Sequence, residues 1–388
     1  MEKIKRKALA ALASTLALSC LFAGCASSGG SKGSSGSKSG AALKIAIVTS
    51  PSGVDDGSFN EDNYNGIKAF IKKNPASTVK AVREPTGDTT AAVQAVADIV
   101  ANYDVIVTPG YQFAGISKIA MQNPSKKFIL IDSDPDKQGD KDTFDNIYAM
   151  TFAEQESGFF AGIAAALETK SNKVAVVNGI AYPSNVNYQY GFMSGVNYAD
   201  KKYSKDVKYV EIPSYAGTDV NNKKVGGNYA GSFSDESTGK VIGNALLQKG
   251  CDILFVAAGA TGNGVFTAVK EAGNAKVIGC DVDQWNDGKN GDKNIILTSV
   301  LKVMDTNVEK TLEAVAGGTF KGGNALLKAD TDSTGFVKTK GHQQLSADTI
   351  SKLDDAYKLV KDGTIVPAAN FNGYTPDNFP GLPGYVKK

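Results

Sequence analysis

The feature of this sequence that most constrains its fold is a regular alternation of short β-branched runs with longer amphipathic segments, from Lys44 to about Gly317. Repeated strand and helix units of this kind predict an α/β fold with parallel sheets. We expect strands at 44–50, 79–84, 104–108, 127–132, 146–151, 172–178, 207–212, 252–258, 275–280 and 295–301. We expect helices at 61–73, 89–102, 112–122, 154–168, 184–201, 236–249, 263–272, 304–316 and 346–362. A short echo between 44–48 and 173–177 suggests two similar lobes.

The first 42 residues predict export and attachment to a membrane. A basic start precedes a mostly apolar stretch from Ala8 to about Leu21, which is shorter than the roughly 18 residues that a spanning helix needs. Small residues before Cys25 resemble a bacterial lipobox, and Cys20 is a second candidate. We therefore expect a signal peptide at 1–24, lipidation of Cys25 and a flexible Ser/Gly linker at 25–42. The body would then lie on the extracytoplasmic face of a bacterial cell membrane.

Composition limits the classes of function. The formal net charge of the whole chain is only +2, so no basic surplus favours nucleic acid as a partner. The single histidine, His342, excludes multi-histidine zinc sites and histidine-based triads unless it is recruited alone. We expect neither a metal nor a cofactor. Cys251 and Cys280 would lie at opposite ends of neighbouring strands, so we expect two buried thiols and no disulfide.

Polar and aromatic residues follow several of the expected strands, where open α/β sheets bind small molecules. After strand 44–50 come Asp55, Asp56, Ser58, Phe59 and Asn60; after the other strands come Tyr111, Asp132, the glycine-rich run 259–264, Asp281, Asp283 and Lys302. Residues at the carboxyl ends of parallel strands meet at one edge of a sheet. The sequence therefore predicts a ligand crevice, although the turn 55–60 alone could be an ordinary helix cap.

The predicted crevice is acidic, with Lys302 as its one cation. Coulomb repulsion disfavours a phosphorylated ligand, whereas carboxylates suit sugar hydroxyls and base N–H donors. The glycine spacing in 259–264 matches neither the dinucleotide fingerprint nor a phosphate loop. A neutral polyol or a nucleoside fits best, and a glycosidase that uses a pair of aspartates remains an alternative.

Six motifs in order resemble those of the basic membrane protein family, whose members are lipid-anchored substrate-binding proteins of ABC importers, best known as purine nucleoside receptors. The motifs are Asp56-Gly-Ser-Phe-Asn60, Phe152-Ala-Glu-Gln-Glu-Ser-Gly-Phe-Phe-Ala-Gly162, Tyr188-Gln-Tyr-Gly-Phe192, Ala258-Gly-Ala-Thr-Gly-Asn-Gly264, Ile278-Gly-Cys-Asp-Val-Asp-Gln284 and Ser299-Val-Leu-Lys302. The resemblance implies a type I periplasmic-binding-protein fold, with two doubly wound parallel-sheet lobes joined by three crossings. We expect lobe 1 to comprise 43–151 plus 284–320, and lobe 2 to comprise 152–283 plus 321–388.

The resemblance also implies roles for individual residues. Phe59 and Phe233 would stack on the two faces of a base, and Asp132 would bind the edge of the base. Gly259, Asp281 and Lys302 would hold the ribose. Asp56, Ser58 and Asn60 would complete the wall of the first lobe.

The function implied is that of a receptor and not an enzyme. It would be a monomer that captures a nucleoside, with a purine nucleoside as the expected ligand, by hinge closure and passes it to a membrane permease. A sugar or autoinducer receptor of the same fold is the alternative. Two features depart from the family pattern: Cys280 with Trp285 nearby, and a longer loop at 215–228. Either could narrow the choice of ligand, while Tyr111, Tyr188 and Trp285 are expected to pack within the protein.

Overall fold

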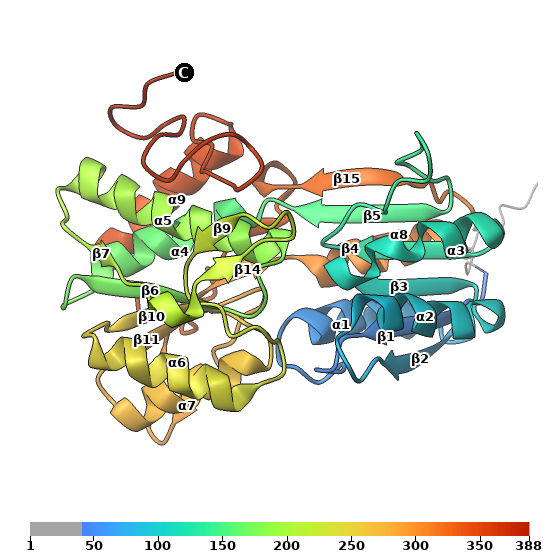
Figure 1. The fold of residues 1–388 in the computed structure, drawn as a ribbon, viewed down its shortest axis with the longest axis horizontal. Helices are drawn as coiled ribbons and strands as arrows, with labels where there is room; N and C mark the ends of the chain where they lie inside the picture. Colours follow the sequence, from blue (N-terminus) through green and yellow to red (C-terminus); the bar gives the residue numbers. More distant parts are fainter. Residues whose placement is uncertain (1–40, 388) are drawn as a thin grey trace, which may run out of the picture. The chain divides into compact units, whose positions relative to one another are not determined.

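The computed structural model describes residues 41–387, which form two six-stranded sheets (Figure 1). The first sheet has the order β15-β5-β4-β3-β1-β2 and is parallel throughout. The second has the order β16-β14-β11-β10-β6-β7 and is parallel except for the pairing of β14 with β16. We call each sheet with its covering helices a lobe. The signal peptide, Cys25 and nearly all of the linker lie outside the described residues.

The strands of the first sheet are β1 (Lys44–Thr49), β2 (Thr78–Arg83), β3 (Val105–Pro109), β4 (Lys127–Ile131), β5 (Ile147–Phe152) and β15 (Gly323–Leu327). Those of the second are β6 (Lys173–Asn178), β7 (Lys208–Tyr209), β10 (Ile253–Ala257), β11 (Lys276–Gly279), β14 (Ile296–Lys302) and β16 (Thr334–Phe336). In both sheets the second strand in the chain flanks the first, and the third lies on the other side. This shared strand order confirms the prediction of two similar doubly wound lobes.

Helices cover both faces of each sheet. In the first lobe, α1 (Phe59–Lys73) and α8 (Met304–Ala316) pack on one face, while α2 (Thr89–Ile99), a 3-10 segment (Tyr111–Ile116) and α3 (Ser117–Gln122) pack on the other. In the second lobe, α4 (Glu154–Glu168), α5 (Pro183–Tyr203) and α9 (Ala347–Lys361) cover one face, and α6 (Glu236–Gln248) and α7 (Thr261–Ala272) cover the other. Strands buried on both faces explain the near-continuous apolar runs in the sequence.

The assignment of strands to sheets differs from the expected lobe boundaries at two places. β14 lies in 284–320, which we assigned to lobe 1, but it pairs with β11 in the second sheet. β15 lies in 321–388, which we assigned to lobe 2, but it pairs with β5 in the first sheet. The chain therefore changes lobe after β5, after β14 and after β15. The first of these three crossings lies where it was expected, and the other two lie at different positions.

The first turn of α4 links all three crossings. Glu156 Oε2 accepts hydrogen bonds from the Ala329 amide at 2.8 Å and from the Thr334 hydroxyl at 2.6 Å. The hydroxyl of Ser157 donates to the Leu301 carbonyl at 2.7 Å and accepts from the Gly335 amide at 3.1 Å. One helix start thus connects the segment after β5 to the end of β14 and to the segment that leads into β16.

Glycines allow α4 and α5 to pack backbone against backbone. A Cβ atom at Gly158 would lie 2.4 Å from the Tyr188 carbonyl oxygen, and one at Gly162 would lie 2.1 Å from that of Phe192. On α5, a Cβ at Gly191 would lie 2.2 Å from the Gln155 carbonyl oxygen. Any larger residue would push the helices apart. This close approach explains the glycines in two of the sequence motifs and brings the start of α5 next to the start of α4.

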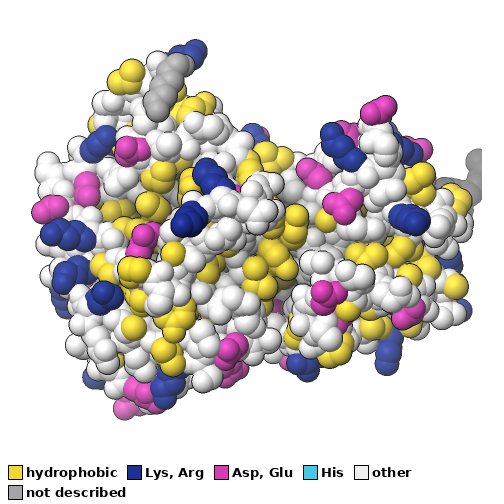
Figure 2. Space-filling view, in the orientation of Figure 1, with side chains coloured by type: hydrophobic (Ala, Val, Ile, Leu, Met, Phe, Trp, Pro, Cys, Tyr) yellow, Lys and Arg dark blue, Asp and Glu magenta, His cyan; other side chains and the backbone are white. Residues whose placement is uncertain are grey.

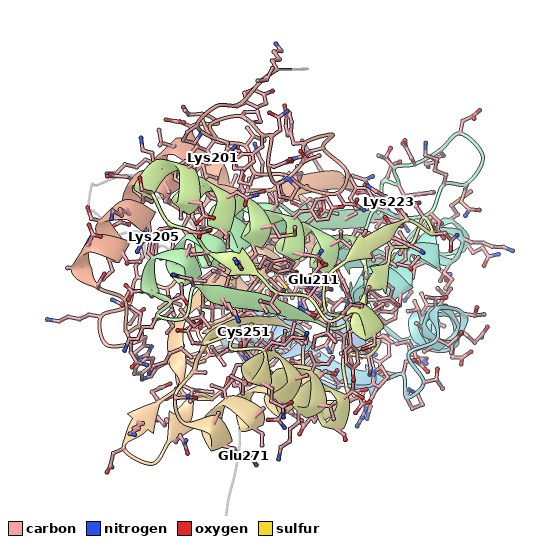
Figure 3. All side chains as sticks on the ribbon, turned by 60° about the vertical axis from the view of Figure 1, so that its left-hand side comes forward. Lys201, Lys205, Glu211, Lys223, Cys251 and Glu271 are labelled. Atoms are coloured by element: carbon pink, nitrogen blue, oxygen red, sulfur yellow. The ribbon has the colours of Figure 1, made fainter. Side chains whose placement is uncertain are left out.

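The loop at 215–228 contains a small hairpin of β8 (Gly217–Thr218) and β9 (Lys224–Gly226) (Figure 3). Lys223, labelled in Figure 3, donates to Asn370 Oδ1 at 3.1 Å, and Asn370 Nδ2 donates to Asp219 Oδ2 at 2.7 Å. The hairpin is thereby fastened to the C-terminal segment. A second short pair, β12 (Lys289–Asn290) and β13 (Lys293–Asn294), follows β11.

Candidate functional site

A cavity lies between the carboxyl ends of strands from both sheets, which is where open α/β sheets bind small molecules. All nine residues predicted to bind ligand line this one cavity: Asp56, Ser58, Phe59, Asn60, Asp132, Phe233, Gly259, Asp281 and Lys302. The structure thus brings together residues that are far apart in the sequence. Their contacts, described next, show what chemistry each can offer.

Lys302 is the centre of charge in the cavity. It is the last residue of β14, it is 2% exposed, and its Nζ donates to Asp132 Oδ2 at 2.5 Å. Asp281 Oδ1 and Glu154 Oε1 each lie 3.7 Å from the same nitrogen. Asp132 belongs to the first lobe and Lys302 to the second, so this ion pair spans the cleft. With three carboxylates around it, Lys302 has no free positive charge to offer a phosphate.

The two aspartates of this cluster occupy equivalent places in the two lobes. Asp132 follows β4 with φ of +60°, and Asp281 follows β11 with φ of +69°. Left-handed backbone is uncommon for residues other than glycine, although aspartate tolerates it, and it recurs at functional sites. The turn brings each carboxylate to the cavity wall beyond the end of its strand.

Aromatic rings surround the ammonium group of Lys302. Its Nζ lies 4.8 Å from the ring centre of Phe59 and 5.5 Å from that of Tyr188, both within the range of cation–π contacts. The Tyr188 hydroxyl also donates to Asp281 Oδ1 at 2.7 Å. Burial, and then the charge of Asp281, raise the pKa of Tyr188 well above its usual value, so this hydroxyl stays a donor. Tyr188 therefore orients the Asp281 carboxylate.

Asp56 supports the start of α1. Its Oδ1 accepts from the amides of Ser58 and Glu61 at 3.1 and 3.0 Å, and its Oδ2 accepts from the Asn60 amide at 3.0 Å. The carboxylate therefore satisfies amides of the helix N-terminus, a capping role that the alternative interpretation gave to Ser58 or Asn60, and the residue also lines the cavity. Ser58 donates across the cleft to the Cys280 carbonyl at 3.4 Å.

Two buried acceptors at the cavity make no hydrogen bond within the described residues. They are Asn60 Oδ1 and Asp132 Oδ1. The Asn60 side-chain amide donates to Ser50 Oγ at 3.0 Å, and the other oxygen of Asp132 is bound to Lys302. Buried polar atoms without partners are costly, so each of these oxygens is suited to a donor on a bound molecule.

Phe233 comes from the segment that precedes α6. A Cβ at Gly179 would lie 2.2 Å from the Phe233 ring, so the ring rests directly on the backbone there. Tyr182 lies beside it, with ring centres 6.0 Å apart, and Tyr111 lies 5.1 Å from Tyr182. Gly259 has φ of +53°, and a Cβ there would come within 3.3 Å of the Phe233 carbonyl oxygen. Glycine at 259 thus meets both a backbone and a packing requirement.

The residues that depart from the family pattern differ in whether they line the cavity. Cys280 lines the cavity, and its thiol donates to Asp281 Oδ1 at 3.6 Å. Trp285 instead stacks on His342, with ring centres 6.0 Å apart, and His342 Nδ1 lies 2.5 Å from Asp283 Oδ2. Neither Trp285 nor the loop 215–228 contributes to the cavity lining. As predicted, Cys280 and Cys251 are buried free thiols.

Several residues of the site were missed or misread in the sequence. Tyr111 and Tyr188 line the cavity, contrary to the expectation that they only pack within the protein. Glu154 lies two residues after the end of β5, so the search for residues after strands could have found it, whereas Tyr188 lies within α5. The signal that could have found Tyr188 is the glycine spacing at 158 and 162 and at 191 and 195, which indicates that α4 and α5 are in close contact.

The buried carboxylates make stability depend on pH. Burial, assisted by Asp132 and opposed by Lys302, raises the pKa of Glu154 to about 8. A carboxyl with a raised pKa keeps its proton in the folded state, so its contribution is full below the unfolded pKa and is lost as pH rises through 8. We expect the free energy of unfolding to fall between about pH 5 and pH 9, by up to about 1.4 kcal/mol per pH unit for one group.

Urea denaturation at several pH values measures this dependence. Glu154→Gln should flatten the slope because glutamine does not titrate. The matched control is Glu271→Gln, an exposed residue paired with Lys240 at the surface (Figure 3). Equal slopes for the wild type and for Glu154→Gln would show that Glu154 is ionised throughout this range.

Within residues 41–387 no group of three or more histidine, cysteine, aspartate or glutamate side chains is arranged to hold a metal ion. Over the same residues, no helix has the length and apolar character needed to cross a membrane. Figure 2 shows acidic and basic side chains intermingled over one face of the molecule.

Residues 43–216 and 214–370 match the model of the Bmp family, which is described as ABC transporter substrate-binding protein PnrA-like. The chain belongs to this family, which confirms the resemblance found in the motifs. It is 33% identical over 346 residues to the ABC transporter nucleoside-binding protein BmpA of Lactococcus lactis, covering 83% of this chain and 88% of that protein. It is also 29% identical over 385 residues to a CD4+ T-cell-stimulating antigen of Listeria innocua, covering 93% and 98%.

Solved structures support the fold. An ABC transporter solute-binding protein from Aeropyrum pernix aligns with a TM-score of 0.71 and 22% identity, covering 85% of this chain and 94% of that one. At this level of identity the likeness concerns the fold alone. The fold is thus that of periplasmic-binding proteins, as expected.

Proposed function

We propose that this chain is a lipid-anchored substrate-binding protein of an ABC importer and that it captures a nucleoside, most suitably a purine nucleoside, between its two lobes. The observation that carries the proposal is the composition of the cavity that all nine expected ligand-binding residues line. It combines two half-buried phenylalanines, Phe59 and Phe233, with buried carboxylates and with acceptors that lack donors. Stacking on an aromatic ring contributes about 1 to 3 kcal/mol per base and tolerates different bases.

Hydrogen bonds would supply the choice of ligand. Asp132 Oδ1 would accept from an N–H on the base edge, and Asp281 would accept from ribose hydroxyls beside Lys302 and Gly259. Because Lys302 is already surrounded by three carboxylates, a nucleotide would add negative charge without a cation to receive it. The nucleoside-binding relative in Lactococcus lactis is in line with this ligand class.

Capture would proceed by closure of the lobes on the ligand. Contacts from both lobes favour the closed form because a ligand shifts the equilibrium toward the state that it binds more tightly. Besides the ion pair of Lys302 with Asp132, hydrogen bonds from Ser52 to Phe233, from Ser58 to Cys280 and from Gln284 to Gly57 already join the lobes across the cleft. The protein would act as a monomeric receptor without catalysis and would deliver its ligand to a membrane permease. Cys25 would anchor it.

Thermal shift and calorimetry on the full chain test this function. We expect guanosine, inosine or adenosine to raise the melting temperature, because a ligand present at about 100 times its Kd stabilises the folded state by about 2.7 kcal/mol. Guanosine monophosphate and ribose at the same concentration should give little or no shift.

A response to ribose or another sugar alone would identify a sugar receptor of the same fold. Release of free base from guanosine during the incubation would identify a glycosidase. The absence of a shift with every nucleoside would reject the proposal. Radiolabelled palmitate incorporation into the wild type, and its loss in Cys25→Ser, would test the anchor separately.

A further inference from the structure

The segment that carries Phe233 is held by one buried threonine at the start of α7. Thr261 Oγ1 donates to the Ser232 carbonyl at 3.0 Å and accepts from the Asp235 amide at 2.9 Å. The Thr261 amide donates to the Phe233 carbonyl at 3.1 Å. The threonine is fully buried, so these groups have no water to replace their partners. Three bonds from one residue therefore hold the backbone on both sides of Phe233.

The same carbonyl receives a hydrogen bond from the opposite lobe. Ser52 lies in the turn after β1, and its hydroxyl donates to the Phe233 carbonyl at 3.1 Å. One oxygen atom thus accepts from Thr261 in the second lobe and from Ser52 in the first. Because the acceptor belongs to the backbone, this contact between lobes does not involve the ring that faces the ligand.

The position of the ring leaves little freedom. It rests on Gly179 and packs beside Tyr182, so a shift of the backbone at 232–235 would move the ring out of the cavity wall. Thr261 belongs to the glycine-rich run 259–264, of which only Gly259 was expected to take part in ligand binding. The contacts show that the threonine within the motif has a separate structural task.

We propose that Thr261 is a positioning residue for Phe233 and that Ser52 is a latch, which fixes the Phe233 segment against the first lobe when the cleft is closed. The inference rests on the proposed function, since it assigns to both hydroxyls a part in holding a nucleoside. The Ser52 hydroxyl, although it lines the cavity, donates to the Phe233 carbonyl, and the Thr261 hydroxyl donates to the Ser232 carbonyl, so neither has a free proton to donate to a base. Loss of either one therefore weakens the binding of different nucleosides by the same factor.

Calorimetry with guanosine, inosine and adenosine tests the latch and the positioning residue. Thr261→Val keeps the shape of the side chain and removes both hydroxyl bonds, while Ser52→Ala removes one bond. We expect Kd to rise about fivefold for each hydrogen bond lost, equally for all three ligands. Ser52→Ala should act through faster dissociation, measured by stopped-flow displacement of guanosine. Thr261→Ser should restore wild-type affinity because serine can make both bonds.

Hydrogen exchange on the ligand-free chain gives a reading that does not depend on any nucleoside. The Asp235 amide should exchange faster in Thr261→Val and at the wild-type rate in Thr261→Ser. The matched control is Ser234→Ala, which removes a hydroxyl from the same segment that contacts only Ser232. It should leave both affinity and exchange unchanged.

The outcomes separate the two proposals. Unchanged exchange of Asp235 in Thr261→Val would overturn the positioning role. Faster exchange with unchanged affinity would show that the order of the segment does not serve ligand binding. If the Kd rises by different factors for the three nucleosides, the proposed latch role of Ser52 is wrong, because Ser52 or Thr261 would then discriminate between bases. If the wild type binds none of them, the proposed function fails, and the exchange result still decides whether Thr261 anchors the segment.

Discussion

Replacing Lys302 with methionine is expected to lower the free energy of unfolding by about 3 to 5 kcal/mol and to abolish the response to nucleosides. The magnitude is that of removing one partner from a buried ion pair, which leaves charge without compensation. Here the remaining partners are the side chains of Asp132 and Asp281, together with Glu154, whose pKa of about 8 leaves it mostly protonated at pH 7. Methionine has a similar length, so the change removes the charge with little loss of packing.

The charge state of Lys302 supports this expectation. Burial alone would lower its pKa, but the charges of Asp132, Asp281 and Glu154 outweigh burial and raise the pKa above its usual value. For a lysine with a raised folded-state pKa, the stabilisation is complete below the unfolded pKa and is lost only as pH rises through the folded one. The contribution is therefore fully present at neutral pH.

Urea denaturation at pH 7 measures the loss. The matched control is Lys80→Met, an exposed lysine on β2, which should change the unfolding free energy by less than about 0.5 kcal/mol. If Lys302→Met unfolds within 1 kcal/mol of the wild type, the three carboxylates must already be protonated or hydrated. The cluster would then not depend on the lysine.

The alternation of strands and helices was sufficient to predict an α/β fold with parallel sheets, whereas the periplasmic-binding-protein fold was inferred from the family resemblance. Parallel strands buried on both faces leave a strong apolar signal, and every expected strand overlaps one in the structure, although 207–212 shrinks to the two residues of β7. The sheet to which a strand belongs was harder to predict. The crossing after β14 occurs at Val303, with neither glycine nor proline to mark it, so β14 was placed with the helix that follows it. The sheet to which β14 belongs is decided by its pairing with β11, which is not visible in the local sequence.

For the candidate site too, the sequence predicted which residues lie together but not what each of them contacts. Residues after strands were found because the carboxyl ends of parallel strands converge, a general property of these sheets. The task of each residue depends on neighbours that are distant in sequence. Asp56 was expected to face the ligand, yet both of its oxygens bind amides of α1. Thr261 appeared only as a member of a glycine-rich run, and its bonds to the Phe233 segment depend on how that segment folds.

Asp281→Asn is expected to weaken guanosine binding by about tenfold to a hundredfold while leaving the fold intact. The change removes charge but keeps shape, and asparagine also tolerates the left-handed backbone that Asp281 adopts. The Asn oxygen can still accept from the Tyr188 hydroxyl, and Lys302 keeps Asp132 and Glu154 as partners. The loss should come from weaker hydrogen bonds to the ribose, because bonds to a charged acceptor contribute about 1.5 to 3 kcal/mol.

A comparison of guanosine with guanine isolates the ribose contribution. Guanine lacks the sugar, so Asp281→Asn should change its affinity little. Calorimetry should therefore show a smaller difference in binding free energy between guanosine and guanine in the variant than in the wild type. Asp283→Asn is the matched control, since Asp283 lies two residues away, contacts His342 and is absent from the cavity wall. An equal loss for guanine and guanosine would place Asp281 at the base, whereas wild-type affinity for guanosine would remove it from the site. Only a loss confined to the nucleoside fits a carboxylate that Tyr188 and Lys302 orient toward ribose hydroxyls.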